Sequence, residues 1–259
     1  MTIDVDKDWW RTLFDDLYLK TDARSVCDED LTRREVDCIL QMLDPAPGDR
    51  ILDLCGGQAR HSLELARRGF SRLTLLDYSP HLLSLGSRRA DEENLQVHFV
   101  RGDARRTAFR DRSFDAVLVL GSSFGYFVEE RENRRILAEA ARILDGGGRL
   151  LLDLPDADFV IGNFCPETTH PVDADMRVER RRELQGRIIC CRERVFSRKR
   201  GLIRENTYCT RLYGREEISG LLKQAGFAEI TFLADFMRRD TQGDFGTMTN
   251  RMVTVARRL

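Results

Sequence analysis

Three acidic side chains occur at intervals that suit contacts with a nucleoside. Asp53 lies in a first apolar run, Asp77 ends a second, and Asp103 follows a third. Gly56 and Gly57 separate the first run from a helix-forming stretch; glycines let the backbone approach a ligand, and the first amides of a helix offer free N–H donors. Asp77 comes about twenty residues after these glycines, where a carboxylate can accept hydrogen bonds from ribose hydroxyls. The chemistry indicated is the binding of a nucleoside or nucleotide.

These residues are positioned by an alternation of strands and helices. Nearly continuous apolar runs are typical of parallel strands covered on both faces, and the stretches between them contain good helix formers at helical spacing. We expect strands at 50–54, 73–77, 97–101, 114–121 and 149–154, and helices at 62–69 and 130–143. Because the carboxyl ends of parallel strands meet at one edge of a sheet, the three acids are predicted to lie together in an α/β domain.

Residues 53–62, Asp-Leu-Cys-Gly-Gly-Gln-Ala-Arg-His-Ser, resemble the first motif of the class I S-adenosylmethionine-dependent methyltransferases. In the small-molecule branch of that family the motif reads Asp-Leu-Gly-(Cys/Gly)-Gly-x-Gly-Arg-His-Ser, and the resemblance extends over roughly residues 30–155. It implies a doubly wound, Rossmann-like sheet of seven mostly parallel strands, with helices on both faces and the last strand antiparallel. Cys55 and Ala59 stand where the family commonly has glycine.

The resemblance also implies S-adenosyl-L-methionine as the methyl donor and S-adenosyl-L-homocysteine as the product. In the family, the turn after the first strand carries the methionine part of the cofactor. The acid after the second strand holds the ribose hydroxyls, and the acid after the third reaches the adenine amine. Carried over to this chain, these positions and their neighbours form the expected cofactor site: Asp53, Cys55, Gly56, Gly57, Asp77, Tyr78, Ser79, Gly102, Asp103, Ala104, Leu120 and Gly121.

The acceptor is expected beside the segment after the fourth strand, because open α/β sheets bind ligands at the carboxyl ends of their strands. This segment lacks the Asn/Asp-Pro-Pro-Tyr/Phe signature of enzymes that methylate base amines or glutamine amides, which argues against those acceptors. His170 is the histidine to test as a catalytic base, and Tyr18 and Tyr126 are candidates for orienting the acceptor. The expected acceptor contacts are Ser122, Ser123, Phe124, Asp156, Arg211 and Tyr213.

The chain is expected to have four parts. They are a helical lid at 1–45, with helices at about 6–20 and 30–43; a cofactor-binding core at 46–160; an inserted antiparallel hairpin or small sheet at 161–215; and a C-terminal helix with the final strands at 216–259, the strands at about 229–236 and 252–256. Partial alternation of apolar and polar residues between 177 and 215 predicts the insertion. We expect it to roof the acceptor pocket.

Composition excludes several classes of protein. The net charge of −1 gives no general attraction to nucleic acid, and no stretch approaches the roughly twenty apolar residues of a membrane span. The N-terminal residues lack the basic and apolar regions of a signal peptide, so we expect a cytoplasmic protein. The seven cysteines show no metal-site spacing, and the aspartates after the fifth strand suit a turn or helix cap better than a metal site.

The function expected is methyl transfer to an oxygen or nitrogen of a small-molecule acceptor, by a monomer or homodimer. An RNA-modifying methyltransferase that uses the arginine-rich insertion is one alternative, and its binding would weaken steeply as salt rises. A non-catalytic S-adenosylmethionine-binding protein is another. A short-chain oxidoreductase is disfavoured because the chain contains no Tyr-x-x-x-Lys pair.

Overall fold

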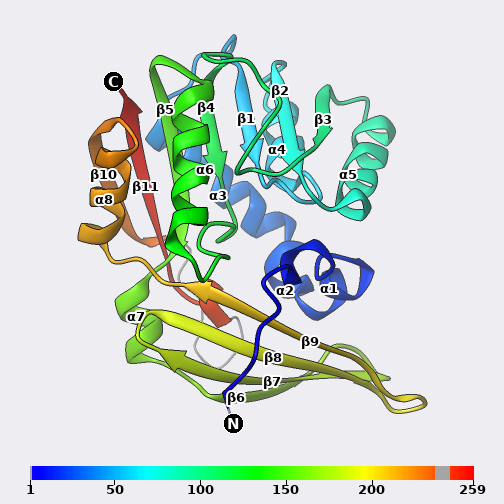
Figure 1. The fold of residues 1–259 in the computed structure, drawn as a ribbon. Helices are drawn as coiled ribbons and strands as arrows, with labels where there is room; N and C mark the ends of the chain where they lie inside the picture. The colour runs from blue at the N-terminus through cyan, green and yellow to red at the C-terminus, as the bar shows by residue number, and fades with distance from the viewer. Residues whose placement is uncertain (1, 237–245) are drawn as a thin grey trace.

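The computed structural model describes residues 2–236 and 246–259. Its centre is a seven-stranded sheet with the strand order β10-β11-β5-β4-β1-β2-β3 (Figure 1). The strands are β1 (Ile51–Leu54), β2 (Leu73–Asp77), β3 (Val97–Arg101), β4 (Phe114–Val119), β5 (Leu144–Pro155), β10 (Phe227–Phe236) and β11 (Arg251–Arg258). Neighbours among β1 to β5 pair in parallel, whereas β11 is antiparallel to both β5 and β10. The expected Rossmann-like sheet with an antiparallel last strand is confirmed.

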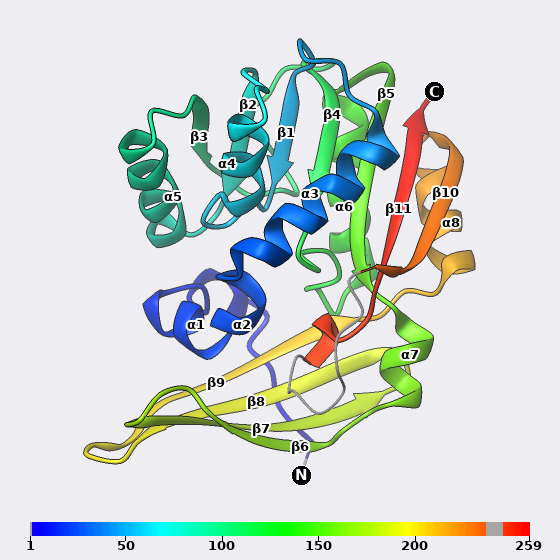
Figure 2. The ribbon, with the colours of Figure 1, turned by 180° about the vertical axis from the view of Figure 1, so that it is seen from behind.

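Helices cover both faces of this sheet. The first face carries α3 (Glu29–Leu43), α4 (Arg60–Arg67) and α5 (Pro80–Glu92), and the second carries α6 (Glu130–Ile143) and α8 (Arg215–Gln224) (Figures 1 and 2). Each helix turns an apolar stripe toward the strands; Ile39 of α3 and Leu137 of α6 are buried in clusters that include strand residues. Removing such stripes from water is the main force that holds the three layers together.

A separate four-stranded antiparallel sheet lies across the carboxyl edge of the large sheet (Figure 2). It follows α7 (Ala157–Gly162), and its strands are β6 (Glu167–Pro171), β7 (Met176–Gln185), β8 (Ile188–Ser197) and β9 (Gly201–Arg211). The Asp156 side chain caps α7 by accepting from the Phe159 amide at 3.0 Å. Of the two forms predicted for the insertion at 161–215, a hairpin or a small sheet, the structure has the small sheet, and its first strand, β6, precedes the alternation recognised from residue 177.

The N-terminal segment corrects one prediction. We expected a single helix over about 6–20, but the structure has a 3₁₀ turn, η1 (Trp9–Arg11), followed by the short helices α1 (Asp16–Thr21) and α2 (Ala23–Val26). The Asp15 carboxylate accepts from the amides of Leu17 and Tyr18 and so starts a new helix at that point. A side chain that caps a helix in this way competes with continuation of the preceding turn.

The N-terminal segment is tied to the inserted sheet. The Ile3 amide donates to the Glu183 carboxylate on β7 at 2.9 Å, and Arg204 on β9 pairs with Asp15 at 2.7 Å. Both figures show α1 and α2 beside this sheet and below the large one. The first residues of the chain and a sheet that follows them by more than a hundred residues thus enclose one space.

A cluster of buried charges joins α3 and α4 to the centre of the large sheet. Arg251 of β11 pairs with Glu35 of α3 and with Asp153 of β5, and Arg60 of α4 also pairs with Glu35. Burial alone would raise the pKa of Glu35, but Arg251 and Arg60 hold that pKa well below its usual range. His61 Nε2 lies 2.8 Å from Glu35 Oε2. Burial lowers the pKa of His61 to about 4, which keeps its imidazole neutral at neutral pH.

The described residues contain neither a membrane-spanning helix nor a cluster of metal-binding side chains. No helix within 2–236 or 246–259 has the length and apolar character needed to cross a membrane. Over the same two ranges, no group of three or more histidine, cysteine, aspartate or glutamate side chains is arranged to hold a metal ion.

Candidate active site

The first cavity opens at the carboxyl ends of β1, β2 and β3. It is lined by every residue of the expected cofactor site except Ser79: Asp53, Cys55, Gly56, Gly57, Asp77, Tyr78, Gly102, Asp103, Ala104, Leu120 and Gly121. Ser79 instead caps α5, where its hydroxyl accepts from the Leu82 amide and donates to the Phe14 carbonyl at 2.7 Å. Segments that are far apart in sequence meet here because their strands are parallel neighbours.

The turn after β1 has a backbone that favours glycine. A Cβ on Gly56 would lie 2.6 Å from Leu75 Cδ1, so only glycine fits there. Gly57 has a φ of 57°, and Cys55 and Ala59, which stand where the family commonly has glycine, have φ values of 65° and 67°. A residue with a Cβ adopts this left-handed conformation at a cost of about 1 kcal/mol. The chain thus keeps the glycine geometry at both departures from the family motif.

Asp53 offers an unused acceptor to the first cavity. Its Oδ2 accepts from the Ser62 hydroxyl at 2.7 Å, while its Oδ1 is buried without a hydrogen-bond partner among the described residues. Burial raises the pKa of Asp53 to about 6. A buried carboxylate oxygen that lacks a donor is costly. A cationic amine in the cavity would satisfy it, and the methionine part of S-adenosylmethionine carries one.

Asp77 and Asp103 form the other polar wall of this cavity. The Asp77 carboxylate accepts from the amides of Gly57 and Ser79, both at 2.8 Å, which fixes its orientation, and burial raises its pKa. A carboxylate has about four acceptor positions, so Asp77 retains acceptor capacity for a ligand hydroxyl. Asp103 is paired with Arg105 through two oxygens, and this pairing outweighs burial and lowers the Asp103 pKa. Arg105 also lies 5.0 Å from the centre of the Trp10 ring.

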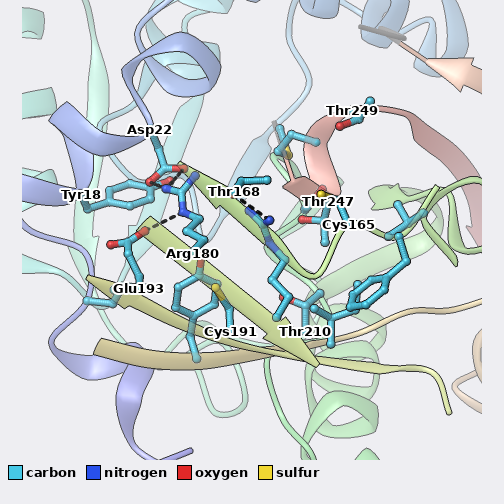
Figure 3. A pocket seen from close by; sticks show the side chains of 18 of the residues that line it. Tyr18, Asp22, Cys165, Thr168, Arg180, Cys191, Glu193, Thr210, Thr247 and Thr249 are labelled. Carbon is cyan, nitrogen blue, oxygen red and sulfur yellow. Dashed lines mark hydrogen bonds and ion pairs between the residues drawn. The ribbon is translucent and has the colours of Figure 1, made fainter. Parts of the chain in front are cut away.

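A second cavity of about 490 Å³ lies between the N-terminal segment, the large sheet and the inserted sheet (Figure 3). It adjoins the first, because Phe14, Tyr18, Gly121 and Tyr126 line both. Burial raises the pKa of Tyr18 and of Tyr126. Their hydroxyls therefore stay protonated at neutral pH and can orient a ligand as hydrogen-bond donors.

The second cavity contains charged residues that the sequence analysis did not identify. Arg180 of β7 pairs with Glu193 of β8 at 2.8 Å and with Asp22 at 3.0 Å (Figure 3). Arg182 of β7 donates to the Thr168 hydroxyl at 3.0 Å. Arg180 and Arg182 are two apart on one strand and so point to the same face. The alternation of side chains along β7 could have identified Arg180 and Arg182 as neighbours on one face. No local pattern could have placed Asp22 beside them, because it comes from the N-terminal part of the chain.

The predicted catalytic and acceptor residues divide between these cavities and the core. His170 and Ser122 line the second cavity, and Ser123 lines the first. The other four predicted acceptor residues lie elsewhere. Phe124 and Tyr213 are buried against each other in the core, with ring centres 5.2 Å apart; Asp156 caps α7; and the Arg211 guanidinium donates to the Val128 carbonyl. Their side chains are used for packing and for local hydrogen bonds, which sequence spacing does not reveal.

Arginines on the outer face of the inserted sheet are paired with glutamates. Glu179 pairs with both Arg177 and Arg194, each at 3.1 Å, and Arg192 lies 3.7 Å from Glu205. Pairing of this kind reduces the positive potential that the strand sequences alone would suggest.

Comparison with known proteins agrees with the geometry of the first cavity. Residues 51–148, which contain β1 to β4 and the glycine turn, match the family model described as a methyltransferase domain. The chain carries a class I S-adenosylmethionine-dependent methyltransferase domain. The matched range includes every residue of the expected cofactor site.

Two curated relatives and one solved structure show how far the similarity extends. A demethylmenaquinone methyltransferase of Renibacterium salmoninarum is 32% identical over 65% of this chain and 66% of its own length. A glycine/sarcosine N-methyltransferase of Parasynechococcus marenigrum is 29% identical over 82% of this chain and 74% of its own. The sugar N-methyltransferase KedS8 of Streptoalloteichus shares the fold with a TM-score of 0.68, at 22% identity, over 100% of this chain and 98% of that one. The chain spans about half of the length of several other curated relatives.

Proposed function

We propose that the chain transfers a methyl group from S-adenosylmethionine to an oxygen or nitrogen of a small polar acceptor in the second cavity. The observation that carries this proposal is the junction of the two cavities at Phe14, Tyr18, Gly121 and Tyr126. A donor in the first cavity and an acceptor in the second would meet there. Displacement at a methyl carbon requires donor and nucleophile to be held in line and close together.

The residues of the first cavity fit S-adenosylmethionine, which when bound supplies a methyl group already activated by a sulfonium. Asp53 has a free acceptor for its ammonium, Asp77 retains acceptor capacity for its ribose hydroxyls, and Arg60 lies on the same wall to face its carboxylate. Tyr18 and Tyr126 line the junction, and their protonated hydroxyls can donate hydrogen bonds to a ligand there. The chain's contribution is thus to align the partners and exclude water.

Charge in the second cavity supports a polar acceptor. Asp22, Arg180 and Glu193 line it, and an apolar acceptor such as a quinone would remove water from these groups without replacing its hydrogen bonds. Two of the similar proteins, the glycine/sarcosine N-methyltransferase and the sugar N-methyltransferase, are named for polar acceptors. The paired arginines of the outer face favour a small molecule over RNA.

Calorimetric titration with S-adenosylmethionine, S-adenosylhomocysteine and NAD tests the donor half of this proposal. We expect micromolar binding of the first two compounds and none of NAD. Incubation with methyl-labelled S-adenosylmethionine and a panel of small amines and alcohols then tests transfer. Binding of neither sulfur compound, or transfer only to RNA with a steep salt dependence, would overturn the proposal.

The affinity for S-adenosylmethionine is expected to fall in mild acid. Because burial raises the pKa of Asp53 to about 6, only about a tenth of this carboxyl is ionised at about pH 5, and a protonated carboxyl does not attract an ammonium. We expect affinity to drop roughly five- to tenfold between about pH 7.5 and pH 5, measured by calorimetry. Asp77 also has a raised pKa, so Asp53→Asn is the matched control: it should bind weakly throughout, with a smaller pH dependence. A full pH response in Asp53→Asn would remove Asp53 from the cofactor contacts.

A further inference from the structure

Aromatic rings form one side of the second cavity where it meets the first. Trp9 is the centre of this aromatic wall, and its ring centre lies 5.1 Å from that of Tyr126, 5.7 Å from that of Tyr208 and 6.1 Å from that of Phe14. Tyr18 continues the wall, 5.0 Å from Phe14. All five rings line the second cavity. Most are tilted against their neighbours by 43° to 86°, so ring faces and edges are turned in several directions.

Carboxylates stand beside this wall. Figure 3 shows Tyr18, Asp22, Arg180 and Glu193 grouped on one side of the cavity, with Cys165, Thr247 and Thr249 on the other. Asp22 also accepts from the Thr21 hydroxyl at 2.9 Å, so its position is fixed by two groups. Electron-rich rings and carboxylates both attract cations. Asp22 and Glu193 are already paired with Arg180, so the attraction for a further positive charge at this end of the cavity comes mainly from the rings.

We propose that the acceptor is an amine whose nitrogen is held at the aromatic wall, and that the wall retains this nitrogen through successive methylations. The inference rests on the function proposed above and specifies its acceptor. The face of an aromatic ring attracts an ammonium through its charge, and this attraction does not require an N–H group that points in a particular direction. A site built only from hydrogen-bond acceptors loses one contact with each N–H that becomes N–CH₃. The aromatic wall keeps its attraction as N–H groups are replaced.

Each transfer is balanced as follows. The bound ammonium first loses a proton to water, and the neutral amine that results forms an N–CH₃ bond with its lone pair. The S–CH₃ bond breaks with its electron pair remaining on sulfur, so the positive charge passes from sulfur to nitrogen. The product is an ammonium with one more methyl group, which is the species that the rings bind. While this ammonium still has an N–H, it can lose that proton to water, and the resulting amine can react again with fresh donor.

The experiment measures binding of simple ammonium ions to protein saturated with S-adenosylhomocysteine. Methylammonium, dimethylammonium, trimethylammonium and tetramethylammonium chlorides are titrated at constant ionic strength, with tert-butanol as an uncharged compound of similar size. The fluorescence of Trp9 reports binding, and only one other tryptophan, Trp10, is present. Trp9→Phe keeps a ring in the wall but should abolish the fluorescence change on binding, which assigns that change to Trp9. We expect affinity to stay level or rise along the series and tert-butanol to bind more weakly.

Two variants at one position test the wall itself. Tyr208→Leu removes a ring and is expected to weaken tetramethylammonium binding by about 2- to 30-fold, whereas Tyr208→Phe keeps the ring and should bind it about as well as the unaltered protein. Affinity for S-adenosylhomocysteine should be the same in both, which shows that the fold is intact. If affinity falls with each added methyl group, if tert-butanol binds as well as the ions, or if no ion binds, the inference is overturned while the proposed function stands. Failure of S-adenosylhomocysteine to bind overturns the proposed function instead.

Discussion

Replacing Asp77 with alanine is expected to weaken the binding of S-adenosylmethionine by roughly 10- to 150-fold, which corresponds to about 1.5–3 kcal/mol of binding free energy. Two effects combine in this loss. In the proposed site the ribose hydroxyls would lose a charged acceptor. The amide of Gly57, which donates to Asp77 at 2.8 Å, would lose the contact that fixes the glycine turn. Calorimetric titration of the purified variant measures the change.

Asp77→Asn is the matched control, because an amide has the shape of a carboxylate and retains one acceptor oxygen but carries no charge. Its loss of affinity should lie between that of the alanine variant and none. Thermal unfolding of the ligand-free proteins should show that both variants are folded. An alanine variant that binds S-adenosylmethionine within about twofold of the unaltered protein would remove Asp77 from the proposed site.

Replacing Arg251 with methionine is expected to lower the free energy of unfolding by about 3–5 kcal/mol. The guanidinium is completely buried and pairs with Glu35 and Asp153. Methionine fills part of the space but carries no charge. Asp153 then loses its paired cation, and Arg60 alone remains paired with Glu35. Removing one partner of a buried ion pair leaves an uncompensated charge, and this is the source of the large cost. Urea unfolding followed by circular dichroism measures it.

Arg257→Met provides the comparison on the same strand. Arg257 pairs with Glu229 at 3.3 Å, but both side chains are more than half exposed. Exposed pairs contribute about 0–1 kcal/mol because water competes for both charges. The two substitutions remove the same group from β11 and differ mainly in burial. Similar losses for the two variants would contradict the structural role that we assign to the buried charges.

Local signals in the sequence were sufficient to predict the large sheet and most of the proposed cofactor site. Apolar runs that end in acids, and a glycine turn before a helix, depend on residues close together in the chain. The same kind of signal misled at the N-terminus: the spacing of aromatic residues suggested one helix over about 6–20, but the Asp15 side chain starts a new helix. Periodicity cannot weigh a single capping hydrogen bond against continuation of a turn.

Residues of the second cavity could not be predicted in the same way. Asp22, Arg180 and Glu193 come from three segments that only the folded chain brings together. Phe124 looked like an acceptor contact because it follows β4, yet it is fully buried against Tyr213. Position along the chain places a residue near the sheet edge, but the direction of its side chain depends on neighbours that the sequence does not reveal. Tyr208 was missed for the same reason.

The placement of β6–β9 has a consequence for how such proteins diversify. The proposed donor contacts precede β5, whereas Arg180, Glu193 and Tyr208 all belong to one uninterrupted stretch between α7 and α8. An exchange of that stretch by recombination would alter much of the second cavity and leave the glycine turn and its acids unchanged. If the proposed function holds, selectivity for a new acceptor can therefore evolve in one contiguous segment, independently of the residues proposed to hold the methyl donor.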